Sequence, residues 1–475
     1  MPRQASPGHS GSQTERVAGA IRQRIAARRL GPGDRLPSIR AMAGAMAVSA
    51  STVVEAYDRL AAEGAIRARR GAGFFVSQSA TLPPLSLVDR RAGQERDIDP
   101  FWVSSHSLDA DPAALKPGCG WLPPHWMPAD PIRKALRSLA RGGDATLTDY
   151  GPTRGSAALR RLLAARCAAD GLEVAPDQIL LTGSATQAVD LICRLLLRPG
   201  DTVMVDDPCY FNFRALLRAH QVAIVGVPWT LAGPDIETFE RLAAASTPRL
   251  YLTNSALHNP TGATMSAQVA HRLLVKAAAH DMTIIEDDTF VDFEPDPSPR
   301  LAVLDGLERV IRVGSFTKTL SASARCGFVV ARPGWVDELV NLQLASNFGG
   351  PSPISAELVA QLLAGGFYRK HVEELRRKLA KAQRETVARL AVVGIEPWTT
   401  PRGGFNLWCS LPGEVDSAEM ARRALDDGVV LAPGNVYSAS QSAANFMRFN
   451  VAQCGGVGLT AKLERAMNRA MLARG

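Results

Sequence analysis

The stretch VIRVGSFTKTLSASARCG, residues 310–327, decides the fold of most of this chain. It begins with apolar residues typical of a buried strand and continues into a loop of small residues that contains Lys318. A lysine held in such a loop can form a Schiff base with an aldehyde, although most lysines are solvated surface residues. Ser315 and Arg325 flank Lys318, and both side chains can bind a phosphate group.

The same order of strand, turn and helix recurs on both sides of this stretch. From about residue 113 onwards, short apolar runs alternate with longer helical segments. This alternation predicts an α/β fold with an open, mostly parallel sheet and helices on both faces. The expected strands are QILLT (178–182), DTVMVD (201–206), AIVGVP (223–228), RLYLTN (249–254), TIIED (283–287), RVIRVG (309–314) and CGFVVA (326–331).

Residues at the ends of three other strands suit the binding of a phosphorylated aromatic ring. Ser184, Ala185 and Thr186 open a helix, and the unpaired N–H groups of a helix start bind phosphate. Tyr210 follows the next strand and can stack on a ring, although a tyrosine of the hydrophobic core is an equal alternative. Asn259, in HNPTG, lies on a turn, and its amide can donate to a phenolate-like oxygen.

The strand TIIED runs into three successive carboxylates, Glu286, Asp287 and Asp288. A carboxylate at a strand end can pair with a protonated ring nitrogen, as expected of sites for pyridoxal phosphate (PLP). The same triplet can instead bind Mg²⁺. Nothing else in the sequence suggests phosphoryl transfer, so we predict no metal site.

Residues 1–80 are strongly basic, whereas the rest of the chain is nearly neutral. They contain twelve arginines, no lysine and five acidic residues, so they carry +7 of the net charge of +8. A concentrated positive field suits the phosphate backbone of nucleic acid, and a neutral body suits a small-molecule domain. A solvated basic face is the alternative interpretation.

The apolar pattern within this basic segment predicts a winged helix-turn-helix. Three short helices are expected, the second capped by Ser38 and the third by Ser49 or Ser51, followed by a hairpin of AIRARR and GFFV. We assign residues 14–77 to this domain, residues 78–112 to a linker without a clear element, and residues 113–475 to the α/β domain.

The third helix of a helix-turn-helix enters the major groove of DNA with its first residues at the base edges. A winged helix that contacts protein is the alternative. The residues expected to contact DNA are Ser49, Ser51 and Thr52 at the bases, Arg35 and Arg40 at phosphates, and Arg67, Arg69 and Arg70 on the wing.

Composition excludes several other classes of protein. The 475 residues allow about two to four domains. The chain has no apolar run of the roughly 18–20 residues that span a bilayer, and its first residues lack the apolar stretch of a secretory signal. The seven cysteines are scattered without a CxxC pair, so neither a disulfide framework nor a zinc site is indicated. We expect a cytoplasmic protein without membrane contact.

Two family resemblances follow from these motifs. The segment LPSIRAMAGAMAVSASTVVEAYDRLAAEGAI, residues 36–66, resembles the GntR family of bacterial regulators. That family usually has an arginine where this sequence has Ala50, so one DNA contact of the family is missing. The order and spacing of the five strand-end segments resemble fold type I, PLP-dependent aminotransferases over nearly all of residues 113–475. SFTKTL with Arg325 is the most specific part.

The aminotransferase resemblance implies a role for each candidate residue. Lys318 would carry PLP as a Schiff base, Asp287 would pair with the pyridine nitrogen, Asn259 would bond the ring hydroxyl oxygen, and Tyr210 would stack on the ring. The remaining implied roles are phosphate binding by Ser184, Ala185, Thr186, Ser315 and Arg325, a phosphate contact across a dimer interface by Tyr150 in TDYGPTRG, and binding of a ligand carboxylate by Arg448 in NFMRFNVA. GGFNLW and VVLAPGNVY match the small C-terminal α+β domain of that family.

One position departs from the aminotransferase pattern. Many of these enzymes have a tyrosine three residues after the pyridine-pairing aspartate, and this sequence has Phe290. Phenylalanine cannot donate to the ring oxygen, and Thr289 is the candidate substitute. Turnover as a transaminase is therefore less expected than PLP binding.

The joined architecture resembles the MocR subgroup of GntR regulators over nearly the whole chain. The resemblance implies a DNA-binding, head-to-tail homodimer in which an amino compound displaces Lys318 from PLP and thereby changes DNA binding. Two other classes stay open, a working aminotransferase and a regulator that uses the domain only to dimerise. The sequence does not identify the effector, beyond the carboxylate that Arg448 favours.

Overall fold

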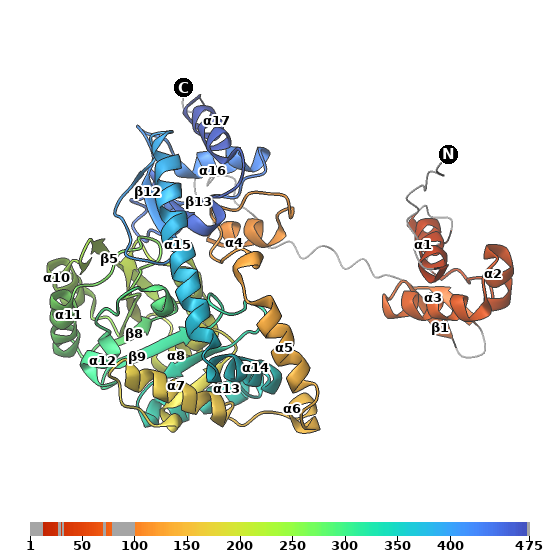
Figure 1. Ribbon diagram of the computed structural model, residues 1–475, viewed down its shortest axis with the longest axis horizontal. Coiled ribbons are helices and arrows are strands. Elements are labelled where there is room, and N and C mark those ends of the chain that lie inside the picture. Colours follow the sequence, from red (N-terminus) through yellow and green to blue (C-terminus); the bar gives the residue numbers. More distant parts are fainter. Residues whose placement is uncertain (1–12, 27–29, 31–32, 70–72, 78–99, 473–475) are drawn as a thin grey trace. The chain divides into compact units, whose positions relative to one another are not determined.

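The computed structural model describes residues 13–26, 30, 33–69, 73–77 and 100–472. The chain forms two compact units, Met1–Gln94 and Glu95–Gly475, which are taken in turn. Figure 1 labels their helices and strands. Among the described residues, no helix combines the length and the apolar character that crossing a membrane requires.

The N-terminal unit is the expected three-helix domain with a hairpin. Its helices are α1 (Gln13–Ala26), α2 (Ile39–Met46) and α3 (Ala50–Ala62), and its antiparallel hairpin is β1 (Ile66–Arg69) with β2 (Gly73–Val76). Ser38 caps α2 by accepting from Ala41 N, and Ser49, rather than Ser51, caps α3 by accepting from Thr52 N. Tyr57 of α3 is fully buried and donates to the Pro37 carbonyl at 2.8 Å. The winged helix-turn-helix prediction is confirmed.

The C-terminal unit is built on an eight-stranded sheet with the order β3-β10-β9-β8-β7-β4-β5-β6. The five central strands run parallel, β10 runs antiparallel to both of its neighbours, and β6 is antiparallel to β5. These strands are β3 (Ile179–Thr182), β4 (Thr202–Asp207), β5 (Ala223–Thr230), β6 (Gly233–Pro234), β7 (Leu250–Thr253), β8 (Thr283–Asp287), β9 (Val310–Ser315) and β10 (Gly327–Val330).

Alternate residues of each strand point to opposite faces of the sheet, and both faces are buried. Ile284 packs into one core and Ile285 into the other. The first core is covered by α5 (Ala129–Leu139), α7 (Ala157–Ala169), α10 (Ile236–Ser246), α11 (Ala267–Ala279), α12 (Leu301–Asp305) and α14 (Pro353–Ala364). The second core is covered by α8 (Ala185–Leu196), α9 (Phe211–Ala219) and α13 (Pro333–Asn347). The mostly parallel α/β prediction is confirmed.

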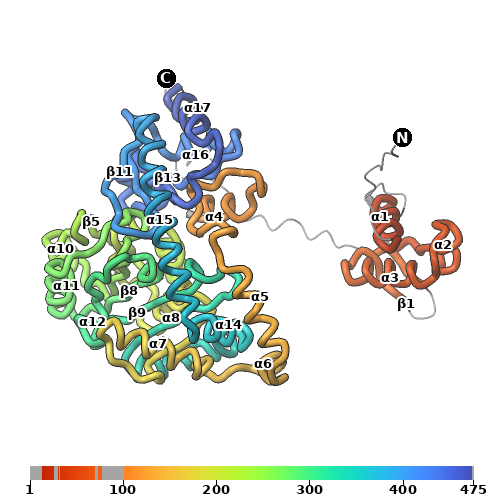
Figure 2. The backbone as a smooth tube through the Cα atoms, in the orientation of Figure 1, coloured from red at the N-terminus to blue at the C-terminus, as the bar shows by residue number. Residues whose placement is uncertain are grey.

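A smaller α+β domain follows and contains a four-stranded antiparallel sheet in the order β11-β12-β14-β13. Its elements are β11 (Glu396–Pro397), β12 (Asn406–Ser410), α16 (Ser417–Asp426), β13 (Ala432–Pro433), β14 (Phe446–Asn450) and α17 (Leu459–Leu472). One helix of 25 residues, α15 (Phe367–Ala391), joins it to the large sheet, as Figure 2 shows. Tyr368 of α15 packs into the core of the large domain, and Leu379 packs into that of the small domain.

The segment predicted to lack regular elements is partly helical, and that prediction is wrong for residues 100–109. These residues form α4 (Pro100–Asp109). Val103 of α4 is buried in the same core as the small domain, and the helix packs against α9. The error has a physical cause, since α4 is short and its inward face includes the polar Ser107. Arg70 and residues 78–99 lie outside the described residues.

Candidate functional site

A cavity of about 200 Å³ lies at the carboxyl ends of the parallel strands. Ten of the candidate residues line it, and they come from five different segments of the chain and from the small domain. These residues are Ser184, Ala185, Thr186, Tyr210, Asn259, Asp287, Ser315, Lys318, Arg325 and Arg448. The carboxyl edge of a parallel sheet is where such folds bind ligands, because the loops that follow the strands converge there.

Lys318 lies deep in this cavity, just after β9. Its Nζ donates to the Gly120 carbonyl at 2.7 Å. Burial, together with the positive charge of Arg448, lowers the pKa of Lys318 from 10.5 to about 8. A larger fraction of this amine is therefore unprotonated near neutral pH than of an ordinary lysine, and the unprotonated amine is the form that attacks a carbonyl carbon.

Asp287 is the one carboxylate of the β8 triplet that lines the cavity. Burial raises the pKa of Asp287, and hydrogen bonds from Thr289 oppose that effect. Asp287 Oδ1 accepts from Thr289 N at 3.0 Å and from Thr289 Oγ1 at 2.5 Å. Because the Thr289 hydroxyl proton is given to Asp287, it is not available to a ring oxygen. Thr289 therefore does not replace the phenol that is missing at Phe290, which also lines the cavity.

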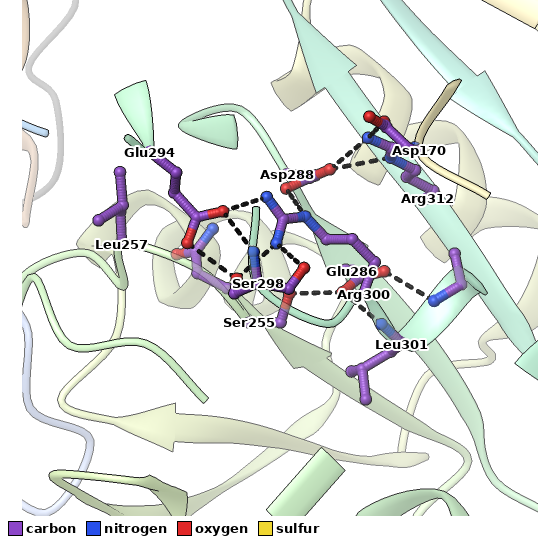
Figure 3. Close-up of polar contacts among 12 residues, drawn as sticks. Asp170, Ser255, Leu257, Glu286, Asp288, Glu294, Ser298, Arg300, Leu301 and Arg312 are labelled. Atoms are coloured by element: carbon purple, nitrogen blue, oxygen red, sulfur yellow. Dashed lines mark hydrogen bonds and ion pairs between the residues drawn. The ribbon is translucent and has the colours of Figure 1, made fainter. Parts of the chain in front are cut away.

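Glu286 and Asp288 are engaged elsewhere, as Figure 3 shows. Asp288 pairs with Arg300 at 2.8 Å and with Arg312 at 2.7 Å. Glu286 accepts from the backbone N–H groups of Leu301 and Ala302, both at 2.8 Å. These interactions hold the end of β8 rigidly and leave only Asp287 directed to the ligand side. Within the described ranges, no three metal-ligating side chains gather into a possible ion site.

Small and hydroxyl residues form an anion cradle at one end of the cavity. The first turn of α8 presents Ala185 and Thr186 behind the capping Ser184, whose Oγ accepts from Gln187 N at 3.0 Å. Gly327 allows β10 to approach this turn, since a Cβ there would lie 2.6 Å from the backbone carbon of Ser184.

Two further groups complete the cradle. Ser315 Oγ lies 2.7 Å from Thr317 Oγ1, and both residues line the cavity. Arg325 also lines it and is exposed. Together with the helix start, these hydroxyls and this guanidinium suit a phosphate group.

Arg448 is the most deeply buried charge of the cavity, with 1% of its surface exposed. It donates to the Gly118 carbonyl and, at 3.4 Å, to Asn259 Oδ1, and it lies 5.3 Å from the centre of the Tyr437 ring. No carboxylate pairs with it in the described part of the chain, and its Nε has no hydrogen-bond partner there. A buried guanidinium without a counter-ion favours an anionic ligand.

The two aromatic candidates, Tyr210 and Tyr150, differ in their position relative to the cavity. Tyr210 lines the cavity with its ring packed against Phe213 at a centroid distance of 5.3 Å. Tyr150 is 82% exposed and does not line the cavity of its own chain. Its ring contacts that of Phe348, which is 67% exposed, at 5.0 Å. Tyr150 and Phe348 thus form a small exposed aromatic patch.

Several lining residues were not found from the sequence. They are Val103, Ser104 and Ser107 of α4, together with Gly120, Trp121, Phe211, Phe213, Thr317 and Phe405. Thr317 lies directly beside Lys318 in SFTKTL, so its position carried a usable signal. The residues of α4 gave none, because no pattern connects them to the strand ends.

Two groups of arginines in the N-terminal unit differ in their ion pairs. Arg22 and Arg59 form ion pairs with Glu15 and Glu63 that join α1 to α3. The other group, Arg35, Arg40, Arg67 and Arg69, is exposed and has no ion-pair partner among the described residues. The second group contains the four described arginines that we predicted to contact DNA.

Comparison with known proteins accounts for both units. Residues 13–76 match the family model "Bacterial regulatory proteins, gntR family", and residues 124–466 match "Aminotransferase class I and II". Over 448 residues the chain is 30% identical to the uncharacterized HTH-type transcriptional regulator YdcR of Escherichia coli (strain K12), an alignment that covers 92% of this chain and 94% of YdcR. It is also 29% identical to the probable rhizopine catabolism regulatory protein MocR of Rhizobium meliloti, over 87% of this chain and 84% of that protein.

The chain belongs to the GntR family of bacterial regulators, in its MocR type. This MocR-type regulator therefore joins a DNA-binding winged helix to an aminotransferase-like domain, and it acts in the regulation of transcription. The aminotransferase-like part also resembles a solved structure of LysN, an alpha-aminoadipate aminotransferase from Thermus thermophilus complexed with N-(5'-phosphopyridoxyl)-L-leucine. The TM-score is 0.71 and the identity 27%, over 78% of this chain and 95% of that one.

Proposed function

We propose that this MocR-type regulator binds PLP through Lys318 and changes its DNA binding when an amino compound with a carboxylate enters the cavity. The observation that carries the proposal is the convergence of Lys318, Asp287 and Arg448 on one cavity. The aldehyde, the ring nitrogen and the phosphate of PLP each meet a suitable group there, namely an amine, a carboxylate and a helix start. Arg448 is buried and has no counter-ion among the described residues, so it is available to bind a second anion.

The residues of the chain hold and orient the ligands. PLP, when bound, supplies an aldehyde that primary amines attack and a ring that accepts electrons. The lowered pKa of Lys318, about 8, keeps a useful fraction of its Nζ free of a proton. With PLP bound, Asp287 would hold a proton on the ring nitrogen, Tyr210 would cover one ring face, and Asn259 would bond the ring oxygen. Arg448 orients the carboxylate of the amino compound beside Lys318.

The loop of Lys318 is tied directly to the helix that joins the two domains. Thr319, the next residue, donates through its hydroxyl to Tyr368 of α15 at 2.8 Å, and its carbonyl accepts from His371 Nε2 at 2.8 Å. Tyr368 in turn donates to Asp292 at 2.5 Å. Since α15 packs into both cores, a change in the attachment of Lys318 can move the small domain relative to the sheet. Such a change alters DNA binding only if the ligand binds the two conformations unequally.

The proposed assembly is a head-to-tail homodimer. The exposed pair Tyr150 and Phe348 supports it, because a second copy would cover these rings. Tyr150 would then reach the phosphate cradle of the partner. A twofold dimer with two winged helices predicts an operator made of paired half-sites.

A working aminotransferase is the second candidate function. Lys318 and Asp287 favour it, because they are the groups that transfer an amino group with PLP. Phe290 counts against it, since neither its ring nor the engaged Thr289 hydroxyl can donate to the ring oxygen.

A visible spectrum of the purified protein, titrated with a panel of amino acids, separates the two candidates. If an amino acid shifts the visible PLP band and the band persists, that amino acid binds without turnover and is identified as the effector. A band that bleaches to a pyridoxamine-like spectrum indicates amino transfer. The absence of any PLP band would contradict both. A chain that begins at residue 78 serves as the DNA control, because it should keep the band and lose operator binding.

A further inference from the structure

The outward face of α3, the helix expected to enter the major groove, is partly apolar. Its inward face consists of Val53, Ala56, Tyr57 and Leu60. On the outward face, Ala50 and Val54 are exposed one helical turn apart, so their methyl groups form one continuous patch. Val54 is 41% exposed, so its methyl groups are open to contact with a partner.

Most polar groups around this patch are already engaged, and Asp58 of α3 is exposed one turn after Val54. Ser49 Oγ lies 2.8 Å from Ser51 Oγ and 2.7 Å from Thr52 Oγ1, so the hydroxyls at the start of α3 bond one another. The carboxylate of Glu55 accepts from Thr14 Oγ1 of α1 at 3.1 Å. The exposed and unpaired arginines belong to other segments and suit phosphates, so no arginine, lysine, asparagine or glutamine of α3 presents a fork of donors to a base. Arg59 of α3 pairs with Glu15.

We propose that Ala50 and Val54 read thymine methyl groups in the major groove, so that this regulator selects its operator by thymine rather than by guanine. Of the four bases, only thymine presents a methyl group there, whereas guanine and cytosine present polar edges. Methyl groups pressed against those polar edges would leave them desolvated and unpaired, which is unfavourable. The inference rests on the DNA-binding part of the proposed function.

The test begins with the full-length protein, supplied with PLP, and a random library of DNA duplexes. Selection identifies the preferred half-site. Each thymine of that half-site is then replaced singly by deoxyuridine, which lacks only the C5-methyl group, and the dissociation constant is measured again. Loss of one buried methyl contact should weaken binding by about fourfold at one or two thymines and leave the others unchanged.

The variant Val54→Ala connects the effect to the residue. At the thymine that Val54 contacts, Val54→Ala should reduce the fourfold ratio between the thymine and deoxyuridine forms, whereas a thymine that Ala50 contacts should keep its ratio. Val392→Ala, a change at a valine that is 79% exposed in the other unit, should keep the fourfold ratio. If Val54→Ala does not fold, the measurement with deoxyuridine on the unaltered protein still decides the question.

Two failures are distinguishable. If selection enriches no sequence, the proposed function fails together with this inference. If a sequence is enriched but every deoxyuridine form binds as well as its parent, the thymine readout alone is overturned. If every sensitive thymine keeps its fourfold ratio in Val54→Ala, the contact with Val54 is overturned.

Discussion

Replacing Arg448 by methionine should raise the pH at which Lys318 captures PLP. The buried lysine has a pKa of about 8 for two reasons, burial first and the charge of Arg448 second. Methionine removes the charge but keeps the volume and the apolar character of the stem, so the first reason remains. The amine should therefore hold its proton to a higher pH in the variant.

The size of the effect follows from the geometry. The Gly120 carbonyl accepts from Lys318 at 2.7 Å, and a Cβ on Gly120 would lie 3.8 Å from Arg448 Nη1, so both charges face one residue. Two unit charges roughly 8 Å apart interact by about 2 kcal/mol at an effective dielectric constant of about 20. Water in the cavity reduces this, so we expect the midpoint to rise by about one pH unit.

The assay is the rate of PLP capture, followed by absorbance between pH 6.5 and 10 in stopped flow. At pH 7.5, a pKa of about 8 leaves about one quarter of the Lys318 amine unprotonated, against roughly one thousandth for a lysine at 10.5. The rate in the unaltered protein should therefore rise with pH and level off above about 9. Loss of this positive charge also weakens the general attraction of the cavity for the anionic PLP, which lowers the rate at every pH and does not move the midpoint.

The control is Arg384→Met, which removes a charge from an exposed position on α15. It should leave the midpoint near 8. The argument is refuted if the unaltered protein shows a midpoint at or above 10, because the amine would then be an ordinary one. The argument is also refuted if Arg448→Met has an unchanged melting temperature and its rate of PLP capture has the same pH midpoint as that of the unaltered protein.

The remaining predictions concern three other residues. Lys318→Ala should lose the visible PLP band while the N-terminal unit keeps its affinity for non-specific DNA, measured by fluorescence anisotropy; a retained band would rule out the Schiff-base assignment. Gly327→Ala should weaken PLP binding in an absorbance titration, because its Cβ would lie 2.6 Å from the backbone of Ser184; Gly334→Ala, where no atom lies within 4 Å, is the control and should leave PLP binding unchanged. Phe290→Tyr should raise single-turnover amino transfer above that of the parent, and an unchanged rate would mean that the missing phenol is not what limits turnover.

The strand ends were predictable because the chemistry there is local. Each short apolar run is followed within a few residues by a polar group, and the parallel order of the sheet brings these groups to one edge. Lys318, Asp287 and Asn259 could therefore be placed in one cavity from the sequence. Ser38 was predictable in the same way, and the cap of α3 was limited to Ser49 or Ser51, since a cap depends only on residues a turn away.

Contacts made over long distances were not predictable. The helix α4 lies outside every repeated pattern, and its place beside the cavity depends on packing against α9. The sequence left the roles of Glu286 and Asp288 open, because their partner Arg300 and the N–H groups of Leu301 are brought to them only by the fold. The isolation of Arg448 from any carboxylate among the described residues is likewise a property of the folded chain.

The cavity separates the groups that hold PLP from the group that would assist its turnover. The amine of Lys318, the carboxylate of Asp287 and the start of α8 act on the ground state, and all three are in place. At Phe290 a single oxygen is missing, and the neighbouring Thr289 hydroxyl is committed to Asp287. An interaction made more strongly in the transition state affects rate more than binding. If PLP binds as proposed, loss of that one donor should leave the affinity for PLP and an amino compound largely intact while it slows their reaction, and a sensor requires this combination.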